Sequence, residues 1–190
     1  MFNLGRKSTY LKGCVVVFIV LSLFHHQTSS AFNRPIYEYG QTLDQQETID
    51  WLWQQAQKLS GIESIYDSHS PTHLPIYIVS NHFMSSEICP TDPENCRNLM
   101  GAYDTQAKRI LLLSSLVPIE EEISASFLVH EFMHALQNEK RTDDEMFGDC
   151  SRLKHSEQEA YHVQNAFLKS QGVLFTAGSG LRMMFCPTEK

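Results

Sequence analysis

Residues 129–136 read Val129-His130-Glu131-Phe132-Met133-His134-Ala135-Leu136. They lie inside a helix predicted from Ile119 to Gln137. Pro118 suits the start of this helix, and the three glutamates that follow suit the positive end of its dipole. Apolar residues cover nearly the whole circumference, so we expect this helix to be buried on most sides. His130 and His134 are four residues apart, which places both imidazoles on one face, within reach of a single metal ion.

The expected burial makes the polar residues of this helix informative. Two histidines and Glu131 would each carry a desolvation cost unless paired, and a metal ion satisfies all three at once. Glu131 leans to one side of the histidine face, where it can touch a water beside the metal without binding the metal. Two nitrogen donors, a nearby base and an open position are what zinc hydrolysis needs, so Zn²⁺ is the predicted cofactor. The alternative is a chance motif in a chain with nine histidines.

A third ligand is expected from a second helix, predicted from about Ser151 to Ser170, which contains Glu157-Gln158-Glu159-Ala160-Tyr161. Glu157 and Glu159 are two residues apart and so about 200° apart around the helix, and only one of them can face the histidines. Gln164 shares the face of Glu157 and is a candidate partner for a ligand. His155 and His162 could replace a glutamate as third ligand, and His82 could support a transition state, but each is more simply a surface residue.

These residues resemble the gluzincin branch of the zincin metallopeptidases, in which a glutamate on a following helix completes the zinc site. The resemblance implies His130, His134 and Glu157 as ligands and Glu131 as the catalytic base, with Glu159 the competing ligand. Tyr161 stands where the family usually has an aspartate that orients a histidine ligand. The metzincin pattern fits less well, because Ala135-Leu136-Gln137-Asn138 follows His134 instead of the expected continuation.

The resemblance also implies an α+β, zincin-like fold, with a small, mostly antiparallel sheet packed on the two ligand-bearing helices. The sequence predicts a helix from Thr42 to Leu59, a strand over residues 76–79, and strands over 101–104 and 109–113, which together make a sheet of about three strands. In zincins a strand beside the active-site helix runs along the substrate. By similarity either residues 100–103 or residues 110–113 would take that role.

The N-terminus predicts a signal peptide over residues 1–31, with three basic residues before the apolar run Cys14 to Phe24 and small residues before a cleavage point. This apolar run is short for a membrane span. The alternative is that it remains as an uncleaved membrane anchor. Residues 32–190 would then form one extracytoplasmic domain, secreted or periplasmic. The net charge is −7 and the leader holds only basic charges, so a nucleic-acid partner is not expected.

Four cysteines remain after the leader, an even number typical of disulfides in an exported chain. We expect Cys89 to pair with Cys96 and Cys150 with Cys186, while a cysteine zinc site is the competing interpretation. The expected function is an extracytoplasmic zinc peptidase that hydrolyses peptide bonds of a peptide or protein with a metal-activated water. Glu131 would take the proton of that water and pass it to the leaving amine. The alternatives are a zinc-containing domain without catalysis and a disulfide-stapled interaction domain.

Overall fold

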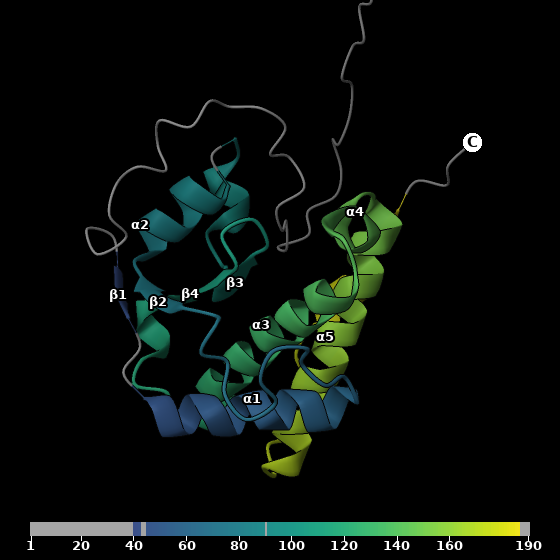
Figure 1. Cartoon of the computed structure of the whole chain (residues 1–190). Helices are drawn as coiled ribbons and strands as arrows, with labels where there is room; N and C mark the ends of the chain where they lie inside the picture. Colours follow the sequence, from purple (N-terminus) through teal and green to yellow (C-terminus); the bar gives the residue numbers. More distant parts are fainter. Residues whose placement is uncertain (1–39, 43–44, 90, 187–190) are drawn as a thin grey trace, which may run out of the picture.

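The computed structural model describes residues 40–42, 45–89 and 91–186, so the predicted signal peptide lies outside the described residues. The fold is α+β, as expected. Its longer helices are α1 (Gln46–Ser60), α3 (Glu122–Lys140) and α5 (Cys150–Ser170), and its short ones are α2 (Asn81–Phe83) and α4 (Asp143–Phe147). Figure 1 shows α1, α3 and α5 gathered on one side of a small sheet.

The sheet has four strands in the order β1-β2-β4-β3. These are β1 (Gly40–Thr42), β2 (Ile76–Val79), β3 (Gly101–Asp104) and β4 (Arg109–Leu113). β1 pairs antiparallel with β2, and β3 with β4, whereas β2 and β4 run parallel. The expectation of a mostly antiparallel sheet of about three strands therefore missed one strand, because three residues are too few for a periodicity signal.

The helix boundaries differ slightly from the predicted ones. α3 begins at Glu122 and ends at Lys140, three residues later at each end than the sequence indicated, so only one of the three glutamates lies in its first turn. α1 begins at Gln46, four residues after the predicted start at Thr42, which instead belongs to β1. It is stopped by Gly61, which adopts the left-handed conformation, with φ of 70°, that glycine accepts without strain. Shifts of this size at a helix end are common, because a sequence pattern locates the ends of a helix only to within a few residues.

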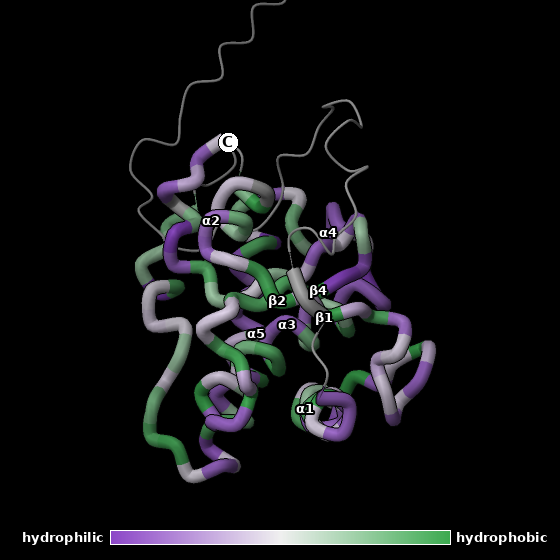
Figure 2. Tube along the Cα trace, turned by 90° about the vertical axis from the view of Figure 1, so that its left-hand side faces the viewer, coloured by the Kyte–Doolittle hydropathy of each residue, from purple (hydrophilic) through white to green (hydrophobic). Residues whose placement is uncertain are grey.

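The main core lies around α3, which packs against β3, α1 and α5. Leu128, Phe132 and Leu136 of α3 are fully buried, and Trp53 of α1 meets Phe132 edge to face with ring centroids 5.1 Å apart. The strands β2 and β4 contribute mostly hydrophobic residues (Figure 2). The expectation that α3 is buried on most sides is confirmed, and its polar residues are therefore enclosed as well.

Two disulfides form, Cys89–Cys96 and Cys150–Cys186, which is the expected pairing. A cysteine zinc site is thereby wrong for these residues, because a bonded sulfur offers no thiolate. Disulfides are typical of oxidising, extracytoplasmic compartments. Among the helices that the structure describes, none has both the length and the apolar character needed to cross a membrane.

Candidate metal centre

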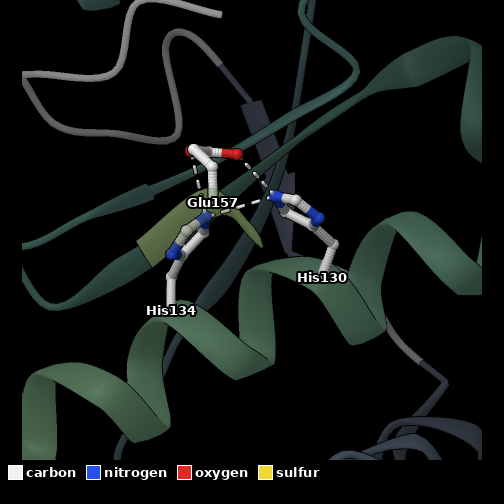
Figure 3. A group of neighbouring side chains, drawn as sticks. All are labelled: His130, His134 and Glu157. Atoms are coloured by element: carbon white, nitrogen blue, oxygen red, sulfur yellow. Dashed lines mark hydrogen bonds and ion pairs between the residues drawn. The ribbon is translucent and has the colours of Figure 1, made fainter. Parts of the chain in front are cut away.

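Three buried side chains from two helices meet at one point. His130 and His134 rise from neighbouring turns of α3, and Glu157 reaches toward them from α5 (Figure 3). The two Nε2 atoms are 3.1 Å apart, His130 Nε2 lies 3.4 Å from Glu157 Oε2, and His134 Nε2 lies 3.3 Å from Glu157 Oε1. The ligand atoms thus form a compact group that can hold a metal ion.

The proton position on His134 follows from its neighbours. Gln137 Nε2 lies 2.8 Å from Glu159 Oε2 and 3.0 Å from the Ser156 carbonyl, both of which can only accept hydrogen bonds. The Gln137 amide oxygen must therefore face His134, whose Nδ1 donates to it over 2.8 Å. With its proton on Nδ1, neutral His134 points the Nε2 lone pair at Glu157.

His130 is oriented by a similar chain of hydrogen bonds. The Ser126 hydroxyl donates to the Ile123 carbonyl over 2.7 Å, so it accepts from Gln164 Nε2 at 3.0 Å. The Gln164 oxygen then accepts from His130 Nδ1 at 3.1 Å. Both imidazoles are therefore held by glutamine amides, and Gln164 has the role that its place on the face of Glu157 indicated, while Gln137 was not anticipated.

Glu157 is the member of the group whose carboxylate faces the two imidazoles. It is 1% exposed, and within the described part of the chain neither carboxylate oxygen has a hydrogen-bond partner beyond these two rings. Burial opposes its ionisation, but the charges of His134 and His130 outweigh that effect and hold its pKa far below the usual range. Two lone pairs and a carboxylate within 3.4 Å of one another repel unless a proton or a cation lies between them.

Glu131 lies next to this group without belonging to it. Burial raises its pKa, and the charge of Glu157 raises it further, against the lowering effect of the two histidines. A Cβ atom at Gly101 would lie 2.8 Å from Glu131 Oε1, so glycine at the start of β3 is what lets the strand approach this carboxylate. The result is a buried carboxyl group with increased proton affinity between α3 and β3.

Glu159, the competing ligand, faces away from the histidines. Arg141 binds both of its carboxylate oxygens, at 2.7 and 3.0 Å, and Gln137 donates to one of them. The guanidinium group thereby holds the pKa of Glu159 below its usual range. Of the two glutamates, Glu157 is the one that the structure brings to His130 and His134.

Tyr161 packs its ring on His130, with centroids 4.6 Å apart, while Gln164 makes the polar contact to His130 Nδ1. Burial raises the pKa of Tyr161, and the charges of Glu157 and Glu131 act in the same direction, so the side chain stays a neutral phenol. His82, His155 and His162 are exposed and stand outside the group, and His155 pairs with Glu159.

The group opens into a cavity of about 310 Å³ that Glu131 also lines. That volume is enough for a metal ion together with further small groups. Comparisons with protein-family models, with curated proteins and with solved structures found no match for this chain.

The metal-free protein is expected to lose about 3 kcal/mol of unfolding free energy between pH 6.5 and pH 9.5. Burial opposes the protonation of His134, but the Glu157 carboxylate outweighs it and raises the pKa of His134 to about 9. A raised pKa stabilises the fold fully below the unfolded value of about 6.5, and this contribution disappears as the pH rises through about 9. Denaturant unfolding with a chelator present measures the effect.

The matched control for this titration is Glu157→Gln, which removes the charge that favours protonated His134. Its stability should change much less over the same pH range. An unfolding free energy of the native chain that stays level from pH 6.5 to 9.5 would contradict the expectation.

Proposed function

We propose that this chain is a zinc-dependent peptidase of the gluzincin-like kind, with a zincin-like arrangement of sheet and helices. The observation that carries the proposal is the surroundings of Glu157, a buried carboxylate whose partners in the described chain are the two imidazole nitrogens that it faces. Ligand atoms around a tetrahedral zinc, each about 2.0–2.2 Å from the ion, lie about 3.3 Å apart. The separations of 3.1, 3.3 and 3.4 Å match that spacing.

His130, His134 and Glu157 would hold the zinc, and Gln164 and Gln137 would keep the two imidazoles turned toward it. When bound there, zinc supplies a Lewis acid that polarises a water and a substrate carbonyl. Glu131 then acts as the base, with a carboxylate oxygen taking the proton of the attacking water. The raised proton affinity of Glu131 favours that transfer and lets the same group deliver the proton to the leaving amine nitrogen.

The substrate backbone would lie along β3. Of the two strands that the resemblance allowed, β4 is paired on both sides, by β2 and β3, whereas β3 is the last strand of the described sheet. Leu113 N–H donates to the Met100 carbonyl, so alternation along the antiparallel pair turns the backbone groups of Gly101 and Tyr103 outward, where the backbone of Tyr103 hydrogen-bonds to Glu131. The cavity reaches Gly101, which brings this edge to the metal centre.

The second candidate is a zinc-containing domain that binds a partner without catalysis. The same three ligands support it, but a closed structural site is typically complete with four protein ligands. Here three ligands face a cavity that Glu131 also lines, and a purely structural site would not need this carboxyl group. These features favour the peptidase.

Purified protein is expected to contain roughly one zinc per chain and to cleave peptides of a mixed-sequence library, with loss of cleavage on chelation and recovery on adding zinc. His130→Ala should abolish both zinc retention and cleavage, because it removes a ligand. His162→Ala, a change at an exposed histidine of α5, is the matched control and should alter neither. Metal analysis and mass spectrometry of the library give the two readouts. Absence of stoichiometric metal after zinc loading would exclude the proposal.

A further inference from the structure

The segment after α5 forms one wall of the cavity at the metal centre. Phe175, Ala177 and Gly178 line the cavity from this segment, together with residues that precede or begin β3 and a residue of α3. The apolar members of the lining come from all three places and are Leu99, Met100, Phe127, Phe175 and Ala177. Beyond the metal group, the cavity is therefore bounded mainly by hydrocarbon.

This wall is fastened to α5, the helix that also carries Glu157. Asn165 makes two hydrogen bonds to the backbone of Ala177, donating to its carbonyl at 3.1 Å and accepting from its N–H at 2.7 Å. Gly178 has φ of 76° and lies so close to Tyr161 that a Cβ atom would come within 2.4 Å of the ring. The Cys150–Cys186 disulfide ties the far end of the segment to the start of α5. The wall thus has a defined position relative to the metal group.

The charges of the cavity are confined to its metal end. Its acidic lining residues, Glu131 and Glu157, belong to the catalytic group, and none of the described lining residues is lysine, arginine or aspartate. A charged substrate side chain placed against the apolar wall would lose its hydration and gain no partner. An apolar side chain would instead cover the ring of Phe175, which is 53% exposed although it lines the cavity.

We propose that this apolar end is the specificity pocket and accepts a large aliphatic or aromatic side chain next to the bond that is cut. Phe175 is its specificity-determining residue, because it is the large apolar side chain that the C-terminal segment brings to the cavity. The proposal rests on the peptidase function, in that the occupant is a substrate residue. The preference itself is a property of binding and can be measured without any cleavage.

The test uses amino-acid hydroxamates, which chelate zinc and carry one side chain each. Calorimetry on the zinc-loaded full chain would compare the hydroxamates of glycine, leucine, phenylalanine, lysine and glutamate. Leucine and phenylalanine hydroxamates are expected to bind on the order of thirtyfold more tightly than glycine hydroxamate, since each buries about 80–100 Å² more apolar surface. Lysine and glutamate hydroxamates should gain little over glycine.

Phe175→Ala should reduce the apolar preference to about fivefold or less, with zinc content unchanged. The matched control is Leu174→Ala, at the preceding position, where the side chain is 99% exposed and does not line the cavity. It should keep the full preference. Equal binding of all five probes, tighter binding of a charged probe, no binding of any probe, or an unchanged preference in Phe175→Ala would each overturn the proposal.

These outcomes separate the pocket from the peptidase function. A protein that prefers apolar hydroxamates but cleaves no peptide would refute the peptidase and keep the apolar pocket as a binding site. A protein that cleaves peptides without the preference would refute the pocket alone.

Discussion

A Glu131→Gln variant is expected to bind zinc as the native chain does and to cleave peptides about 10²–10⁴-fold more slowly. Glutamine keeps the size of the side chain but cannot accept the proton of the attacking water. Glu131 lines the cavity without joining the group of ligand atoms formed by His130, His134 and Glu157, so zinc should stay bound. Parallel measurements of zinc content and of kcat/KM on a cleaved library peptide test both halves of the expectation.

The matched control is Glu122→Gln, the same exchange at an exposed position in the first turn of the same helix. It should leave both quantities unchanged. If Glu131→Gln retained full activity, the proposed proton transfer would be wrong. If it lost its zinc, the distinction between a ligand set and a separate base would be wrong.

Much of the centre follows from local sequence because it depends on helix geometry. The separation of four residues between His130 and His134 puts both imidazoles on one face whatever the rest of the chain does. The same reasoning placed Gln164 on the face of Glu157, and the structure finds its amide on His130. The α+β class and both disulfide pairings were also predicted.

The sequence could not predict the contacts that depend on how α3 and α5 pack against each other. Gln137 orients His134, and its own amide is turned by Glu159 and Ser156, which come from the other helix. Nothing in the spacing of Gln137 predicts those partners. The wall formed by Phe175, Ala177 and Gly178 was also missed, because residues 173–178 have no regular secondary structure and so no periodic pattern.

Helix geometry alone could not decide between Glu157 and Glu159 as the ligand, whereas the packing of the two helices does. Their angular separation on α5 required one to face the histidines and the other to face elsewhere, but left both assignments possible. Arg141, just after the end of α3, resolves this by binding both oxygens of Glu159 at a partly exposed site. Glu157 is left in the interior with the two imidazoles as its neighbours.

Glu157→Gln is accordingly expected to weaken zinc binding by more than about 100-fold, whereas Glu159→Gln should weaken it by about tenfold or less. The first exchange replaces a charged ligand by a neutral amide. The second affects zinc only through Gln137 and His134, while the amide of Gln137 keeps its hydrogen bonds to Ser156. Competition with a chromophoric chelator measures both affinities, and unfolding curves in excess chelator show whether each variant is folded.

The two exchanges are chemically identical and lie two positions apart on one helix, so a difference in zinc affinity reports the position of the carboxylate and not the loss of a negative charge. A greater loss in Glu159→Gln would make Glu159 the ligand and would require α5 to turn relative to α3. Equal losses would mean that the charge of α5 as a whole attracts the metal. Only a loss concentrated at Glu157 agrees with a zinc ion held between that carboxylate and the two imidazoles.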